Sequence, residues 1–240
     1  MNIKVENLTI NYIQYGEGKD VVLLHGWGQN IEMMKPLGNI LSSNHRITIL
    51  DLPGFGNSSE PTEAWSIYEY ESFLEKVLNK LNITNPILIG HSFGGRLSII
   101  YASKNRVDKL VLFGSPCIRK NKLPSLKEKI LKMLMKIPLL NKVGESMKKY
   151  IGSTDYKNAS VIMRKILVNT VNEDLSDCAK KIDAPTLLIW GEYDTEASVE
   201  DAKELEKIMK DAALIVFKGC THYAYLENIA QVKSIFDNFI

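Results

Sequence analysis

The sequence has no apolar run approaching the roughly 20 residues that a membrane-spanning helix needs. At its start it also lacks the basic stretch followed by an apolar stretch that directs secretion. Cysteine is scarce: the chain has three, an odd number without the spacing of a metal site, at Cys117, Cys178 and Cys220. We therefore expect a cytoplasmic protein with neither a membrane span nor a framework of disulfide bonds.

Other signals are missing as well. The sequence has no cluster of metal-ligand residues and no glycine pattern that specifically indicates phosphate binding. No linker-like or low-complexity stretch divides the 240 residues, of which 45% are hydrophobic, so one main domain is expected. The sequence predicts no cofactor and no metal, and it predicts no nucleic acid among the partners.

Charge is nearly balanced overall but unevenly distributed. The formal net charge is +2. Residues 116–181 contain 15 Lys and Arg against 6 Asp and Glu, whereas the remainder contains 15 basic and 22 acidic residues. The middle of the chain is therefore electrostatically distinct from the rest.

Apolar runs and helical patterns alternate along most of the chain. Six short runs are continuously apolar, at residues 21–24, 47–50, 87–89, 110–113, 187–190 and 214–217. Such runs are typical of strands buried on both faces of a parallel sheet. Helical patterns lie between most of them, for example at residues 67–81, 96–103, 199–209 and 229–240. The order predicts an α/β fold with a doubly wound sheet, preceded by a hairpin over residues 3–12.

This alternation is interrupted once, between residues 116 and 183, where no convincing strand run occurs. We expect this segment to be a helical insertion over the carboxyl edge of the sheet. Within it, apolar residues recur at helical spacing over residues 126–137, while lysines occupy other positions. The pattern predicts an amphipathic basic helix that ends near Pro138.

A Gly-His-Ser-Phe-Gly sequence at residues 90–94 directly follows one apolar run and precedes a helical pattern. A serine at such a sharp strand-to-helix turn has a strained backbone, and glycines two residues away on either side avoid a clash. The turn would expose the hydroxyl of Ser92 at a helix N-terminus, where backbone N–H groups favour developing negative charge. Ser92 is the first candidate for a nucleophile, and a glycine-rich structural loop is the alternative.

Candidate partners for Ser92 follow later strands, because functional groups in open α/β sheets collect at the carboxyl ends of the strands. Asp194 and His222 each lie in a loop beyond an apolar run, so serine, acid and histidine occur in that chain order. Imidazole can take the serine proton and later give it to the leaving group. The aspartate would hold the imidazole tautomer and stabilise its charged form.

Two backbone N–H groups are candidates for an oxyanion hole. That of Phe93 directly follows the candidate nucleophile, and that of Trp27 lies in the first glycine-rich loop. Other polar residues in these loops are interpreted as structural. We expect His25 and His91 to tie the loops together by hydrogen bonds, and Asp51 to accept N–H groups of a buried turn.

Five loop segments carry the strongest resemblance to known proteins. They are His-Gly-Trp-Gly at 25–28, Asp-Leu-Pro-Gly-Phe-Gly-Asn-Ser at 51–58, Gly-His-Ser-Phe-Gly-Gly at 90–95, Gly-Glu-Tyr-Asp at 191–194 and His-Tyr-Ala-Tyr-Leu-Glu at 222–227. In this order they resemble the landmarks of the α/β-hydrolase superfamily. The resemblance covers essentially the whole chain.

The resemblance implies the α/β-hydrolase fold, a mostly parallel eight-stranded sheet flanked by helices, with a helical cap inserted between strands six and seven. Mapped onto this sequence, it implies a core of residues 1–115 and 184–240 and a cap of residues 116–183. It also implies that the catalytic residues are Ser92, Asp194 and His222.

Segments 25–28 and 51–56 look like those of pimeloyl-acyl-carrier-protein methyl ester carboxylesterases and of small cytoplasmic carboxylesterases generally. A serine at position 92 distinguishes the chain from the haloalkane dehalogenase branch, which uses aspartate there. One segment departs from the family pattern. Relatives often continue after the acid with a small hydrophobic residue and proline, whereas this chain has Thr-Glu-Ala-Ser after Asp194. Glu192 and Glu196 are the alternatives for the acid.

The sequence therefore predicts a cytoplasmic serine hydrolase that cleaves small-molecule carboxylic esters through an acyl-enzyme on Ser92. One alternative is a carbon–carbon bond hydrolase that cleaves vinylogous diketones with the same triad. Another is a non-catalytic homologue that senses a ligand. The basic segment is either a solvated helix face or a docking surface for an acidic partner, such as an acyl carrier protein, or an anionic lipid surface.

Overall fold

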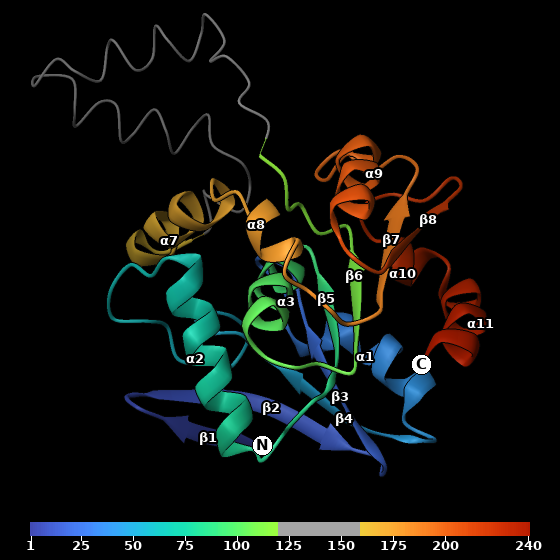
Figure 1. The fold of residues 1–240 in the computed structure, drawn as a ribbon. Helices are drawn as coiled ribbons and strands as arrows, with labels where there is room; N and C mark the ends of the chain where they lie inside the picture. Colours follow the sequence, from blue (N-terminus) through green and yellow to red (C-terminus); the bar gives the residue numbers. More distant parts are fainter. Residues whose placement is uncertain (120–158) are drawn as a thin grey trace, which may run out of the picture.

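The structure is a computed structural model, and it describes residues 1–119 and 159–240. A central sheet is covered by helices on both faces (Figure 1). The amphipathic basic helix expected at residues 126–137 lies outside the described residues.

The sheet has eight strands in the order β1-β2-β4-β3-β5-β6-β7-β8. The strands are β1 (Asn2–Val5), β2 (Leu8–Tyr15), β3 (Lys19–Leu24), β4 (His45–Leu50), β5 (Ile87–His91), β6 (Lys109–Phe113), β7 (Thr186–Gly191) and β8 (Ala212–Phe217). β1 and β2 form the predicted hairpin, and β2 pairs antiparallel with β4. All other pairs are parallel, so the predicted mostly parallel α/β sheet is confirmed.

Burial explains why the central strands carry continuous apolar runs. All five residues of β5 are buried, as are all six of β7. A parallel sheet with helices on both faces removes both sides of each central strand from water. The six apolar runs in the sequence correspond to β3 through β8.

The described helices form two outer layers. They are α1 (Ile31–Leu41), α2 (Ile67–Lys80), α3 (Phe93–Lys104), α7 (Val161–Val171), α8 (Ser176–Ala179), α9 (Val199–Ile208), α10 (Ala224–Glu227) and α11 (Ile229–Phe239). Helices α2, α3 and α9 share one apolar cluster with the sheet, and α1 and α11 share the other. The sheet therefore lies between two hydrophobic layers.

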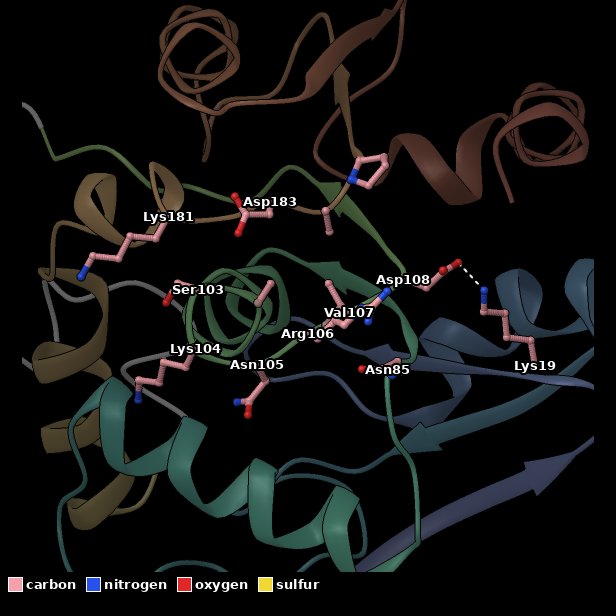
Figure 2. Close-up of a pocket in the computed structure, with 13 residues that line it drawn as sticks. Lys19, Asn85, Ser103, Lys104, Asn105, Arg106, Val107, Asp108, Lys181 and Asp183 are labelled. Atoms are coloured by element: carbon pink, nitrogen blue, oxygen red, sulfur yellow. Dashed lines mark ion pairs between the residues drawn. The ribbon is translucent and has the colours of Figure 1, made fainter.

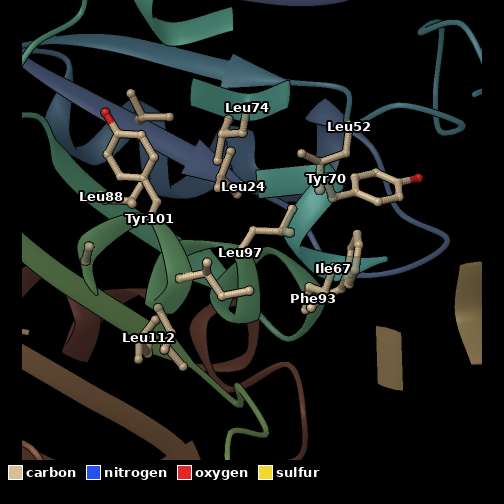
Figure 3. Packing of buried hydrophobic residues seen from close by; sticks show 14 of the residues in the cluster. Leu24, Leu52, Ile67, Tyr70, Leu74, Leu88, Phe93, Leu97, Tyr101 and Leu112 are labelled. Atoms are coloured by element: carbon tan, nitrogen blue, oxygen red, sulfur yellow. The ribbon is translucent and has the colours of Figure 1, made fainter. Parts of the chain in front are cut away.

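Helix α3 is the central element of the first layer. Figure 3 shows Leu97 of α3 among the sheet residues Leu24, Leu88 and Leu112, and all four are fully buried. Fully burying a leucine side chain contributes about 2 kcal/mol. This packing fixes α3, and with it the turn that precedes its first residue.

Between β6 and β7 the described residues contain α7 and α8 and no strand, as predicted for the helical insertion. The division of the chain into a core and a cap of residues 116–183 stays a prediction. Among the described helices, none combines the length and apolar character needed to cross a bilayer.

Candidate active site

Ser92 lies at the turn between β5 and α3. Its φ of 50° and ψ of −111° fall outside the ordinary helix and strand regions, which costs a non-glycine residue of order 1–3 kcal/mol. The flanking glycines are required by space. A Cβ on Gly90 would lie 2.5 Å from the Cα of Gly95, and a Cβ on Gly94 would lie 2.3 Å from the carbonyl oxygen of Leu24. The turn therefore has the tight geometry that the Gly-His-Ser-Phe-Gly spacing predicted.

His222 and Asp194 form a buried pair beyond the ends of β8 and β7. The Nδ1 of His222 donates to Oδ2 of Asp194 at 2.8 Å, and the Asp194 side chain is fully buried. Oδ1 of Asp194 accepts from the backbone N–H groups of Glu196 and Ala197, each at 2.8 Å. Because Nδ1 carries the proton in this hydrogen bond, Nε2 of the neutral ring is left as a base.

The two glutamates that compete with Asp194 are placed differently. Oε2 of Glu192 accepts from the backbone N–H of Gly219 at 2.9 Å. Oε2 of Glu196 lies 3.9 Å from Nε2 of His222, the ring nitrogen opposite the one that Asp194 holds. Neither of them holds Nδ1, so the geometry favours Asp194 as the orienting acid.

The loops that carry Ser92 and His222 are joined by a hydrogen bond. The ring of His91, next to Ser92 in the chain, donates from Nε2 to the carbonyl oxygen of His222 at 3.1 Å. The ring centroids of His91 and His222 are 4.7 Å apart. The structure therefore brings the serine loop and the histidine loop together at the carboxyl edge of the sheet.

Gly114 is a residue of the site that sequence reasoning missed. It follows β6 with a φ of +47°, and a Cβ there would lie 2.9 Å from both Oδ2 of Asp194 and Nδ1 of His222. The position directly after the run at residues 110–113 was the available signal, because this is the sheet edge where functional groups collect. A side chain at this position would push into the Asp194–His222 hydrogen bond.

The two residues expected to form an oxyanion hole pack against each other. Phe93 is the first residue of α3, so its N–H has no acceptor within the helix. The rings of Trp27 and Phe93 meet edge to face at 5.2 Å, and Phe55 packs against Trp27 at 4.9 Å. A cavity of about 400 Å³ adjoins them, lined among the described residues by Trp27, Gly28, Gly54, Phe55, Glu60, Ala159, Ser160 and Met163. The oxyanion hole stays a prediction.

His25 and His91 are structural, as predicted. Nδ1 of His25 donates to the carbonyl oxygen of Gly26 at 2.7 Å, while Nε2 accepts from the N–H of Leu52 at 3.0 Å. Burial lowers the pKa of His25 to about 4. Burial, together with the neighbouring His222, lowers the pKa of His91 to about 3. Both rings are therefore neutral at physiological pH.

Asp51 organises a loop, as predicted. Its carboxylate accepts from the backbone N–H groups of Ile31 and Asn57 and from the side-chain amide of Asn11, each at 2.8 Å. Its carboxylate is therefore held by three donors of the surrounding loops. A catalytic role for Asp51 is therefore disfavoured.

A larger cavity, of about 750 Å³, lies away from this site, near the C-terminal end of α3 and the amino ends of β3 and β6 (Figure 2). An ion pair of 2.5 Å between Lys19 and Asp108 borders it. Ser92 and His222 lie beyond the opposite ends of the strands, so this cavity is not part of the candidate active site. Within residues 1–119 and 159–240, no group of three or more His, Cys, Asp or Glu side chains is placed to hold a metal ion.

The order and direction of the strands are those of the α/β-hydrolase fold. A family model for the alpha/beta hydrolase fold matches residues 20–140, about half of the chain. The chain belongs to this family.

The names of similar proteins describe different activities. The chain is 25% identical to 2-hydroxy-6-oxononadienedioate/2-hydroxy-6-oxononatrienedioate hydrolase of Escherichia coli (strain K12), over 98% of the chain and 92% of the relative. It is 23% identical to pimeloyl-[acyl-carrier protein] methyl ester esterase of Aliivibrio fischeri (strain MJ11), over 94% of the chain and 95% of the relative. The solved esterase EaEST of Exiguobacterium antarcticum superposes with a TM-score of 0.76 at 23% identity, over 98% of this chain and 96% of that one. That superposition confirms the fold.

Proposed function

We propose that this chain is a serine hydrolase that cleaves carboxylic esters with Ser92, His222 and Asp194 as its catalytic residues. The observation that carries the proposal is the buried Nδ1–Oδ2 hydrogen bond of 2.8 Å, which leaves Nε2 of His222 as a base beside the loop of Ser92. A strained serine at the start of a buried helix supplies the nucleophile.

In the proposed reaction, Oγ of Ser92 attacks the ester carbonyl while its proton passes to Nε2 of His222. The backbone N–H groups of Phe93 and Trp27 stabilise the resulting oxyanion. The C–O bond to the alcohol then breaks, and the protonated His222 gives its proton to the leaving alcohol. A water molecule deprotonated by His222 then attacks the carbonyl carbon of the acyl-enzyme. The bond between that carbon and Oγ of Ser92 breaks, His222 returns the proton to Oγ, and the acid is released. Asp194 stabilises the charged imidazole in both halves of the reaction.

The second candidate function is cleavage of a carbon–carbon bond in a vinylogous diketone. It is supported by the Escherichia coli relative, whose name gives an oxo-dienedioate as its substrate. The same serine, acid and histidine would serve that chemistry. The ester reaction is preferred because loops 25–28 and 51–56 resemble those of small carboxylesterases, and a methyl ester esterase is among the relatives.

Hydrolysis of a series of p-nitrophenyl esters, from acetate to long acyl chains, tests the proposal. We expect activity in the wild type and a loss of about a thousandfold or more in Ser92→Ala. The acyl-length profile would then report the depth of the site. If the wild type hydrolyses no ester but cleaves a dienoic diketone, the carbon–carbon function replaces the ester function. Turnover of neither substrate would instead support the ligand-sensing alternative.

We also propose a cytoplasmic location and an acidic partner, such as an acyl carrier protein, for the basic segment of residues 116–181. The three cysteines are free thiols, which supports a reducing compartment. The excess of basic residues in the segment and the acyl-carrier substrate in the name of the Aliivibrio fischeri relative support the partner. Attraction between these charges would weaken as salt concentration rises.

A further inference from the structure

A second carboxylate lies beside His222, on the other side of the ring from Asp194. Oε2 of Glu196 is 3.9 Å from Nε2 of His222. The Glu196 side chain is 64% exposed, whereas that of Asp194 is fully buried. Asp194 is thus buried beside Nδ1. Glu196 is exposed to solvent and lies near Nε2, the nitrogen that exchanges protons in the proposed reaction.

The backbone holds Glu196 at this place. Its N–H donates to Oδ1 of Asp194 at 2.8 Å, and the N–H of Ala197 donates to the same oxygen at 2.8 Å. The Cα of Glu196 is therefore tied to the acid that orients His222. In the structure its carboxylate lies 3.9 Å from the ring of His222.

Glu60 adds a negative charge to the cavity beside Trp27. Glu60 lines the 400 Å³ cavity beside Trp27, and it accepts from the hydroxyl of Ser160 at 2.5 Å. None of the described residues that line this cavity is basic. Among the described residues, one carboxylate therefore lies beside His222 and another lines the cavity beside Trp27.

We infer that Glu196 is a specificity-determining residue that disfavours substrates carrying an anionic group close to the ester carbonyl. A carboxylate on the acyl group of the substrate would be placed close to the Glu196 charge, and the two like charges would repel each other. The preferred substrates are then uncharged around the scissile bond. This inference rests on the proposed ester hydrolysis.

The test compares two p-nitrophenyl esters of similar length, the butyrate, which is neutral, and the succinate, which ends in a carboxylate. The measured quantity is the ratio of kcat/KM for the succinate to kcat/KM for the butyrate. Glu196→Gln keeps the size of the side chain and removes its charge, so it should raise this ratio by about fivefold or more at low salt. The increase should shrink as salt concentration rises, because screening weakens the repulsion in the wild type.

Glu17→Gln is the matched control. It removes the same charge from the exposed loop before β3, at the opposite edge of the sheet, and should leave the ratio unchanged. A structural effect of the Glu196 substitution would change both esters together and leave the ratio constant, and that result would overturn the inference while ester hydrolysis stood. If the wild type hydrolyses neither ester, the proposed function fails, and the inference is rejected with it.

Discussion

Single residues set the geometry of the pair that would activate Ser92. Asp194 receives two backbone N–H groups on one oxygen and His222 on the other, so its carboxylate has one orientation. Gly114 leaves the space in which this pair lies. The hydrogen bond between Asp194 and His222 therefore depends on the absence of a side chain at position 114.

Gly114→Ala should disrupt the Asp194–His222 hydrogen bond, because the added Cβ would lie 2.9 Å from both bonded atoms. We expect kcat/KM for a p-nitrophenyl ester to fall by about tenfold or more, since small misplacements of reacting groups cost up to about a hundredfold in rate. Steady-state kinetics on the folded variant measure this.

Gly219→Ala separates this effect from backbone strain. Gly219 also has a positive φ, of +71°, but a Cβ there meets nothing within 4 Å. Both variants should lose about 1–2 kcal/mol of unfolding free energy, and only Gly114→Ala should lose activity. Equal kinetics in the two variants would show that the space at Gly114 is unimportant.

Ser92, Asp194 and His222 could be identified as candidates from the sequence. Each of them follows an apolar run, and functional groups collect at the carboxyl ends of parallel strands. The sequence left Glu192 and Glu196 open as acids, since three carboxylates within five positions cannot be separated by spacing alone. The hydrogen bond at Nδ1 and the approach of Glu196 to Nε2 depend on how the loop folds back. The fold of this loop, and not the spacing of its carboxylates, therefore decides which of them faces Nδ1.

At the scale of elements, a buried arginine joins the two ends of the inserted segment to the helix of Ser92. Arg96 in α3 donates to the carbonyl oxygens of Pro116 at 2.6 Å, of Thr170 at 2.9 Å and of Glu173 at 2.6 Å. It is only 4% exposed, and burial lowers its pKa. The segment that leaves β6 and the segment that returns toward β7 therefore meet on α3.

Arg96→Met should destabilise the protein by about 3 kcal/mol, because it leaves three carbonyl groups without their donor. Urea unfolding at pH 7 measures the free energy. Arg106→Met is the control, since Arg106 is exposed in the loop after α3 and should change stability by no more than about 0.5 kcal/mol. A loss at Arg96 no larger than the loss at Arg106 would show that this arginine does not hold the segment.

The strands and the helices α2, α3, α9 and α11 could be predicted from periodicity, but α1 (Ile31–Leu41) was not among the predicted helices. It contains Pro36, a residue that usually ends or kinks a helix. Ile31, Met34 and Leu37 of this helix nevertheless pack in the second apolar cluster with β3 and β4. The tertiary gain from that packing outweighs the local cost of the proline. The Asn30 cap and the helical spacing of the three apolar residues were the local signals for this helix.

The whole molecule should be sensitive to acid, because its two structural histidines are buried in neutral form. Burial lowers the pKa of His25 to about 4 and, with the neighbouring His222, that of His91 to about 3. In the unfolded chain, histidines titrate near about 6.5. Between pH 6.5 and 4 the unfolded chain binds protons that the folded protein does not, so stability decreases as pH falls.

We expect the unfolding free energy to decrease by about 4 kcal/mol from pH 7 to pH 5, about 2 kcal/mol for each of the two histidines. Urea unfolding across this range measures it. In His91→Gln, the decrease should be roughly half as large, although the variant starts from a lower stability. An unfolding free energy that is equal at pH 5 and pH 7 would contradict the neutral burial of these rings.

The architecture of the whole molecule could be predicted, because the order of apolar runs and loop segments is typical of an α/β-hydrolase sheet. The contacts of Pro116, Thr170 and Glu173 with α3 could not, since the basic composition of this part of the sequence does not specify them. Their pairing with α3 through Arg96 is a long-range contact between backbone carbonyls and one side chain. Sequence patterns carry little information on such contacts.

The covalent role of Ser92 can be measured by mass spectrometry of the protein quenched during turnover of p-nitrophenyl butyrate. We expect one butyryl group per chain, located on the peptide that contains Ser92 and absent from Ser92→Ala. Ester hydrolysis without an acyl group on Ser92, or with the group on another residue, would contradict the assignment of Ser92 as the nucleophile.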